Sequence, residues 1–89
     1  MHAVLTSVTV KDPATAEKYL REQVVPSVKQ APGFVAGYWV RDGGEGRGTI
    51  VFESEDAARG AAERIRERVG DNPGVTLNSV TVGEVVANA

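Results

Sequence analysis

The sequence predicts one α+β domain over residues 1–89, with its elements in the order strand, helix, strand, strand, helix, strand. Two observations support this order. Apolar residues recur at three- and four-residue spacing in two segments, which is typical of helices that bury one face. β-Branched and aromatic residues, which favour strands, concentrate in four other segments: 2–10, 34–41, 47–53 and 75–86. Because a short turn joins the two middle strands, we expect them to pair antiparallel as a hairpin within an α+β domain.

The first strand leads directly into a helix. Asp12 is a residue type that caps helices, and Pro13 suits the first helical position. Pro26 lacks a backbone donor and restricts the residue before it, so we expect a kink there or a short second segment from Ser27 to Gln30. The buried stripe of this helix is expected to consist of Ala16, Tyr19, Leu20, Val24 and Val28.

The second and third strands form a hairpin. Its predicted turn, residues 42–46, contains three glycines, which allow positive φ angles. Ser54 caps the second helix, and Glu55 and Asp56 lie in its first turn, where the helix dipole favours negative charge. This helix is expected to end within residues 70–74. Its inward face is expected to consist of Ala58, Ala61, Ala62, Ile65 and Val69.

Composition excludes several classes of function. The chain has no cysteine, which excludes disulfides and thiolate metal sites, and its single histidine, His2, leaves little material for another metal centre. The net charge is −2 and the arginines of the second helix alternate with glutamates, so we expect no nucleic-acid partner. No apolar run is long enough to span a membrane, and the N-terminus does not read as a signal peptide. We therefore expect a cytoplasmic protein without a bound metal.

The strands are apolar on both faces, although two helices can cover one face only. Large apolar residues occur at both odd and even positions of the strands, and the alanine-rich second helix adds little apolar area. A chain of 89 residues also buries a limited share of its surface when it folds alone. We therefore expect the second face of the sheet to pair with another copy of the chain in a homodimer.

Two segments resemble those of a known family. Residues 24–34, VVPSVKQAPGF, lead from the first helix into the second strand, and residues 52–58, FESEDAA, lead from the third strand into the capped helix start. With the hairpin between them, they are similar to the dimeric α/β barrels related to antibiotic biosynthesis monooxygenases. The resemblance covers nearly the whole chain. It implies ferredoxin-like βαββαβ domains, each with a four-stranded antiparallel sheet and two helices on one face. Two such domains are expected to pair sheet to sheet as a homodimer, forming a dimeric α/β barrel.

The resemblance also implies a kind of chemistry. Haem-degrading members have a tryptophan where this chain has Phe52 and a helix histidine where it has Ala61 or Ala62. Because haem iron needs an axial ligand, haem is not expected here. The cofactor-independent oxygenases of the group act on electron-rich aromatic substrates such as quinol-like polyketides. The resemblance thus implies an aromatic small molecule as substrate and no cofactor.

Five residues are candidates for a site. Trp39 and Tyr38 can contact an aromatic substrate, but neighbours on a strand point to opposite faces, so both cannot line one pocket. Phe52, at the position of the family's tryptophan, is the third substrate-binding candidate. His2 and Asn78 are the catalytic candidates, one to exchange a proton near neutral pH and one to stabilise an oxyanion. Alternatives stay open: Trp39 can pack in the core or a dimer interface, His2 can be an exposed strand end, and Asn78 can lie at a dimer edge.

The sequence therefore predicts a small homodimeric monooxygenase-like protein that binds or oxidises an apolar or aromatic small molecule without a cofactor. The alternative is a non-catalytic dimer that serves as a ligand-binding or scaffolding module. The alanine-rich second helix and the missing helix histidine favour this alternative. A cavity lined by convergent polar groups would argue against it.

Overall fold

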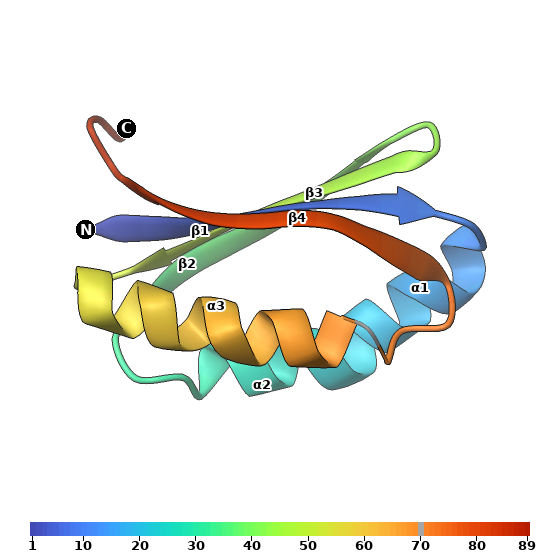
Figure 1. Cartoon of the computed structure of the whole chain (residues 1–89), viewed down its shortest axis with the longest axis horizontal. Coiled ribbons are helices and arrows are strands. Elements are labelled where there is room, and N and C mark those ends of the chain that lie inside the picture. The colour runs from blue at the N-terminus through green and yellow to red at the C-terminus, as the bar shows by residue number, and fades with distance from the viewer. Residues whose placement is uncertain (70) are drawn as a thin grey trace.

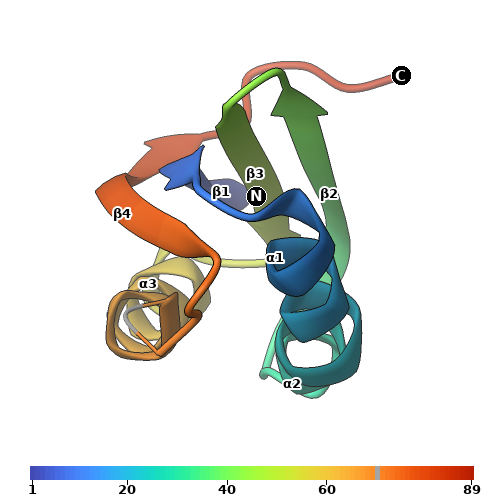
Figure 2. The ribbon, with the colours of Figure 1, turned by 90° about the vertical axis from the view of Figure 1, so that its right-hand side faces the viewer.

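The computed structural model describes residues 1–69 and 71–89, and it confirms the predicted fold. Four strands form one antiparallel sheet in the order β2-β3-β1-β4, with the described helices on one face (Figures 1 and 2). The strands are β1 (His2–Val10), β2 (Phe34–Asp42), β3 (Glu45–Phe52) and β4 (Val75–Glu84). The helical segments are α1 (Pro13–Tyr19), the π-helical segment η1 (Leu20–Val24), α2 (Val25–Lys29) and α3 (Glu55–Val69).

The bounds of the strands differ from the prediction at the hairpin and near the C-terminus. The turn is shorter than predicted, because β2 continues through Asp42 and β3 already begins at Glu45. These two residues pair across the strands, so a two-residue turn closes the hairpin and Gly46 belongs to β3. The last strand ends at Glu84 instead of residue 86. The predicted helix end at Gly70 lies outside the described residues.

The first helix begins where the sequence predicts and is interrupted earlier than expected. The Asp12 carboxylate accepts hydrogen bonds from the Thr15 backbone N–H at 3.4 Å and from the Thr15 hydroxyl at 2.7 Å. The interruption is the wide turn η1 just upstream of Pro26, where the Val25 N–H donates to the Leu20 carbonyl, five residues back. The expected short second segment is present as α2, which runs over Val25–Lys29 instead of residues 27–30. Pro26 has no N–H to continue the regular ladder, so the helix is interrupted beside it.

The core lies between the sheet and the helices, on the face that we call the inner face. Val4, Ile50 and Phe52 are its largest fully buried side chains, and the Phe52 ring meets Phe34 edge to face at a centroid distance of 6.2 Å. Helix α3 packs against the sheet through small residues, as predicted. The buried side chains of α3 are Ala58, Ala61, Ala62 and Ile65.

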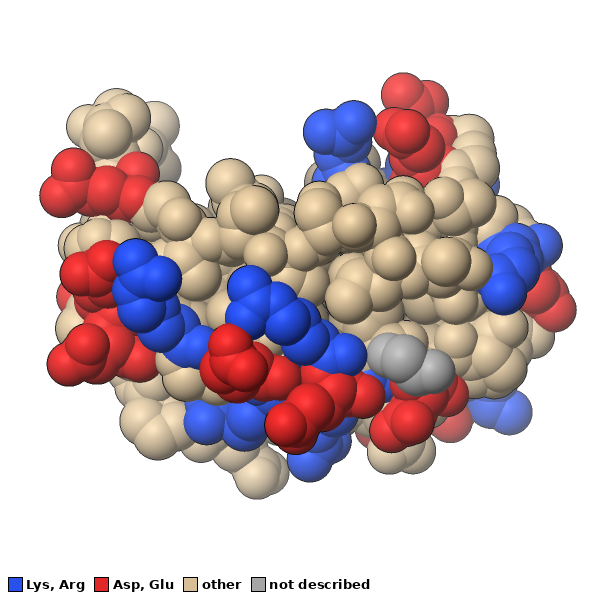
Figure 3. All heavy atoms as spheres, in the orientation of Figure 1, with Lys and Arg blue, Asp and Glu red and all other residues tan. Residues whose placement is uncertain are grey.

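The opposite face of the sheet, which we call the outer face, carries exposed apolar side chains, and none of the described helices lies on it (Figure 1). Leu5, Tyr38 and Val40 keep 43%, 70% and 63% of their surface exposed. Figure 3, which views the molecule from the side of β4 and α3, shows charged residues gathered along α3 and at both ends of the sheet, with a largely uncharged stretch between them. The exposure of Leu5, Tyr38 and Val40 agrees with the apolar second face predicted from the sequence. The homodimer itself stays a prediction.

Candidate functional site

A cavity of about 160 Å³ lies between the inner face of the sheet and the helices. Strand residues from the end of β1 form one side of it, and helical residues form the opposite side. The wall is mostly apolar, because the elements that meet here all present aliphatic side chains. Its aliphatic residues include Val8 and Val10 of β1, Leu20 and Val24 of η1, and Ile65 and Val69 of α3.

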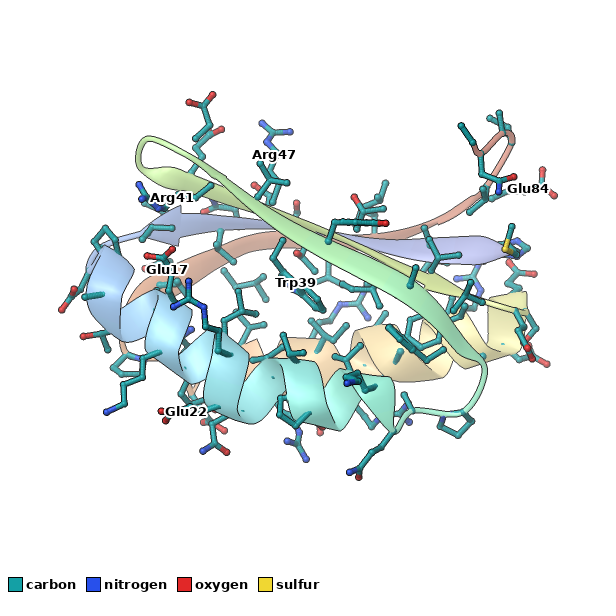
Figure 4. The ribbon with its side chains drawn as sticks, turned by 180° about the vertical axis from the view of Figure 1, so that it is seen from behind. Glu17, Glu22, Trp39, Arg41, Arg47 and Glu84 are labelled. Atoms are coloured by element: carbon teal, nitrogen blue, oxygen red, sulfur yellow. The ribbon has the colours of Figure 1, made fainter. Side chains whose placement is uncertain are left out.

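Trp39 forms the aromatic part of the wall. It projects from β2 toward the helices, as Figure 4 shows. Its partner across the hairpin is Gly48. A Cβ atom on Gly48 would lie 3.0 Å from Cδ1 of Trp39 and 3.2 Å from its Nε1, so the indole lies directly against the β3 backbone. The absence of a side chain at Gly48 therefore determines where the ring lies.

The next inward position of β3 is also a glycine. A Cβ atom on Gly46 would lie 2.8 Å from Cγ2 of Val8, closer than real side-chain contacts occur. Gly46 and Gly48 both line the cavity, while Arg47 between them forms an ion pair with Glu45 on the surface. The two glycines thus leave room for Val8 and Trp39 to pack directly against the β3 backbone in the cavity wall.

This pair of glycines is a signal that the sequence analysis missed. Residues 45–48 read Glu-Gly-Arg-Gly, an alternation of charged residue and glycine with the period of a strand. The alternation is hidden when Gly46 belongs to the predicted turn. A strand that begins at Glu45 places both glycines on the inner face, where Val8 and Trp39 pack against them.

Two polar, uncharged side chains, those of Thr6 and Asn72, also line the cavity. Thr6 of β1 lies on the other side of Gly48 from Trp39, since a Cβ atom on Gly48 would be 2.5 Å from the Thr6 Oγ1. The hydroxyl of Thr6 and the indole N–H therefore border the same point of the β3 backbone. Asn72 is also buried in the wall, and its Oδ1 accepts a hydrogen bond from the Gly74 N–H at 2.9 Å. Thr6 and Trp39 are thus the polar groups available to a ligand in the interior.

Three charged residues also line the cavity. Arg47 of β3 is paired with Glu45, and the other two, Glu17 and Arg41, come from opposite sides. Glu17 comes from α1, and Arg41 comes from β2, two residues after Trp39. Figure 4 places both near the end of the molecule where α1 begins, Glu17 on the helix and Arg41 on the strand above it. Arg41 is exposed and Glu17 is partly exposed, so both belong to the rim and not to the interior.

The three predicted substrate-binding residues occupy three different environments. Trp39 lines the cavity, whereas Tyr38 points to the outer face and is largely exposed. The predicted alternation of these two neighbours is confirmed. Phe52 is fully buried in the core and borders a separate hollow of about 30 Å³. The structure therefore brings none of the three together in one place.

The two predicted catalytic residues lie away from the cavity and from each other. His2 pairs with Phe52 at the opposite end of β1 from Val8 and Val10, and its Nδ1 is buried without a hydrogen-bond partner among the described residues. Asn78 is exposed at an irregularity between β1 and β4, where its Nδ2 donates to the Thr9 hydroxyl at 3.0 Å. Catalytic roles for these two residues stay predictions.

Two carboxyl groups have shifted pKa values, and neither lines the cavity. Hydrogen bonds from the Thr15 side chain and backbone lower the pKa of Asp12. A hydrogen bond and the positive charge of Arg59 lower the pKa of Glu55 at the start of α3. Both carboxylates lie at helix starts, and the interactions that lower their pKa values also stabilise the folded state. Within residues 1–69 and 71–89 there is no group of three or more His, Asp or Glu side chains that could hold a metal ion.

Comparison with solved structures finds the same fold in two monooxygenases. One is a monooxygenase from the gene ActVA-Orf6 of Streptomyces coelicolor, solved in complex with the ligand nanaomycin D. Its sequence is 20% identical to this chain, the alignment covers 98% of this chain and 92% of that chain, and the TM-score is 0.62. The other is a putative monooxygenase from Shewanella loihica PV-4, with 18% identity over 99% of both chains and a TM-score of 0.57. No protein-family model and no curated protein matches the sequence.

At these identities the likeness establishes a shared fold. The chain therefore has the ferredoxin-like α+β fold of antibiotic biosynthesis monooxygenase-like proteins, which confirms the resemblance stated from the sequence. Among the described helices, none is both long enough and apolar enough to cross a membrane.

Proposed function

We propose that this chain is a homodimeric monooxygenase-like protein whose cavity holds an aromatic small molecule and oxidises it with dioxygen, without a cofactor. The observation that carries the proposal is the contact between Trp39 and Gly48, which lays an indole along one wall of an otherwise aliphatic cavity. Aromatic rings stack favourably on such a surface. The structural neighbour solved with nanaomycin D supports small-molecule binding within this fold.

The size of the cavity limits what it can enclose. An apolar cavity of about 150 Å³ in another protein accommodates benzene, and this one measures about 160 Å³. The interior therefore suits a single ring, and any larger fused-ring ligand extends toward the rim. A water-poor interior of this kind also protects a reactive intermediate from side reactions.

The oxidation we propose adds one oxygen atom to an activated ring carbon. In an anthrone, the ring methylene becomes a carbonyl, and the second oxygen atom leaves as water with the two hydrogens. The substrate loses four electrons and dioxygen gains four. Loss of the phenolic or enolic proton concentrates negative charge on a substrate oxygen, and the Thr6 hydroxyl and Trp39 N–H are suited to donate hydrogen bonds to it.

The homodimer in this proposal is supported by the outer face of the sheet. A row of exposed apolar side chains on an uncovered sheet is typical of surfaces that associate. A second copy placed on this face would cover Leu5, Tyr38 and Val40 while leaving the cavity on the inner face accessible. Each protomer would then carry its own site.

The test of the proposal uses the single tryptophan of the chain. Trp39 gives one indole N–H signal in a ¹⁵N-correlation spectrum, and we expect titration with 1,5-dihydroxynaphthalene to shift it. Oxygen uptake with an anthrone should be measured in parallel for the wild type, Trp39→Phe and Tyr38→Phe. We expect Trp39→Phe to lower uptake at least tenfold and Tyr38→Phe to leave it unchanged, because Tyr38 lies on the outer face.

A non-catalytic binding module is the second candidate, and one observation favours it. Among the described residues, the titratable side chains that line the cavity are those of Glu17, Arg41 and Arg47. All three are at least partly exposed at its rim, so the described interior holds no obvious proton acceptor. A shifted indole signal without oxygen uptake would support this candidate. An unshifted signal with every aromatic ligand would contradict both functions.

A further inference from the structure

The rim of the cavity points to the charge of its ligand. In an inference that rests on the proposed function, we propose that the ligand is an aromatic anion, a phenolate or carboxylate, with its ring against Trp39 and its charged oxygen at Arg41. Arg41 is then the residue that determines specificity for the anionic form. Three features of the described residues carry this inference.

The first feature is the spacing of Trp39 and Arg41. They are two residues apart on β2, so their side chains leave the strand on the same face, about 7 Å from one another. Both line the cavity. A ring stacked on the indole therefore places a substituent at its outer end within reach of the guanidinium. Because the interior holds only one ring, the outer end of a larger ligand, with this substituent, lies at the rim.

The second feature is that the Arg41 guanidinium has no carboxylate partner among the described residues. The ion pairs among residues 1–69 and 71–89 involve four other arginines: Arg21, Arg47, Arg59 and Arg66. One nitrogen of Arg41, Nη1, donates to the Gly43 carbonyl at 3.3 Å, which holds the side chain beside the hairpin turn. The remaining N–H groups of a guanidinium can still bind an oxyanion through two parallel hydrogen bonds.

The third feature is Glu17 on the opposite side of the rim. Its carboxylate is 4.0 Å from Arg21, a separation at the limit of an ion pair, so much of its negative charge still acts at the rim. The strand side of the rim is therefore positive and the helix side is negative. A single anion is favoured at Arg41, whereas a second negative group reaching toward α1 would be repelled.

The test compares two ligands that differ in charge and hardly in shape, 2-naphthoate and 2-naphthamide, by isothermal titration calorimetry at low ionic strength. We expect the wild type to bind 2-naphthoate about three- to tenfold more tightly, as for a partly solvated charge-assisted hydrogen bond. Arg41→Gln should abolish this preference. Lys18→Gln removes the same charge from an exposed residue at the same end of the molecule, outside the cavity wall, and should retain it.

Glu17→Gln provides an independent check of where the anion lies. We expect it to strengthen binding of 2-naphthoate and to leave 2-naphthamide unaffected, because it removes a negative charge from the far side of the rim. Weaker or unchanged binding of 2-naphthoate would contradict the placement of the anion.

The outcomes separate this inference from the proposed function. Equal binding of the two ligands by the wild type, or a preference that survives Arg41→Gln, would overturn anion recognition and leave aromatic binding intact. If neither ligand binds, both proposals fail.

Discussion

The indole of Trp39 lies against the backbone of Gly48, its direct partner across the β2–β3 hairpin. Because the two residues are paired, the length of the turn determines this contact. A slip of one residue in the hairpin register would place Arg47 or Thr49 opposite Trp39, with its side chain on the wrong face. The position of Trp39 in the cavity wall therefore depends on the two-residue turn, which sets the pairing, and on the glycine at position 48.

The first prediction concerns Gly48. In Gly48→Ala, the new methyl group would lie 2.5 Å from the Thr6 Oγ1 and 3.0 Å from Trp39 Cδ1, so both side chains must move. Overpacking of this kind typically costs about 1–3 kcal/mol of unfolding free energy, and we expect aromatic ligands to bind more weakly as well. Urea denaturation followed by circular dichroism measures the first effect.

Gly44→Ala is the matched control for this substitution. It adds the same methyl group to the same hairpin, but nothing lies within 4 Å of the added atom. We expect Gly44→Ala to change the unfolding free energy much less. Equal stabilities of the two variants would contradict a tight contact between Trp39 and Gly48.

The second prediction concerns the outer face. Tyr38→Glu places a carboxylate among exposed apolar side chains, and burying that charge against a second copy would be costly. We therefore expect sedimentation velocity to show a dimer for the wild type and a monomer for Tyr38→Glu. Gln23→Glu, which adds the same charge to an exposed position of η1, should remain dimeric. A wild type that sediments as a monomer at all concentrations would refute the homodimer.

The third prediction follows from the lowered pKa of Asp12, whose carboxylate accepts hydrogen bonds from Thr15. The pKa is lower in the folded state than the ordinary value of 3.8. The stabilisation is therefore fully present above the unfolded-state pKa and is lost as the pH falls through the lower folded-state pKa. Glu55, with its pKa lowered mainly by Arg59, adds an effect of the same sign.

Asp12→Asn isolates the charge, because asparagine also caps helices well. We expect the wild type to have the higher melting temperature at neutral pH, with a constant difference down to about pH 4. The difference should then shrink in stronger acid, as the wild-type carboxylate is protonated. A difference that persists unchanged to about pH 2 would mean that the charge of Asp12 is not its source.

Patterns in the sequence predict the elements and the apolar outer face, whereas the sheet topology is implied by the family resemblance. Patterns with periods of two and three to four residues carry this information, and β-branched strands on both faces indicated the surface left uncovered. Sequence reasoning also placed Trp39 and Tyr38 on opposite faces. The elements and the orientation of these two side chains depend on residues close together in the chain, whereas the sheet pairs distant segments such as β1 and β4.

The site was harder to predict because it depends on which distant residues meet. His2 and Asn78 were selected for their chemistry, and nothing in their spacing shows that one lies at the far end of β1 and the other on the outer face. Glu17 and Arg41 meet at one rim because α1 follows the end of β1 while β2 runs back along the sheet. That proximity is a property of the packed layers, which no local pattern contains.

The last prediction concerns Gly74, where the loop before β4 meets the first helix. Its carbonyl accepts hydrogen bonds from the backbone N–H groups of Lys11 at 2.8 Å and Asp12 at 3.2 Å. A Cβ atom on Gly74 would lie 2.6 Å from the Ala16 backbone nitrogen, and a helix backbone cannot move aside as a flexible side chain can. We therefore expect Gly74→Ala to lower the unfolding free energy by about 3 kcal/mol, near the upper end for overpacking.

The same junction also closes one end of the cavity, since Asn72 binds the Gly74 N–H and lines the wall. Asn72→Ala leaves that buried N–H without its acceptor, which costs about 1–3 kcal/mol. Urea denaturation of both variants beside Gly44→Ala measures these effects. If Gly74→Ala were as stable as Gly44→Ala, the loop would have room to move away from α1, and this end of the cavity would be less rigid than its contacts indicate.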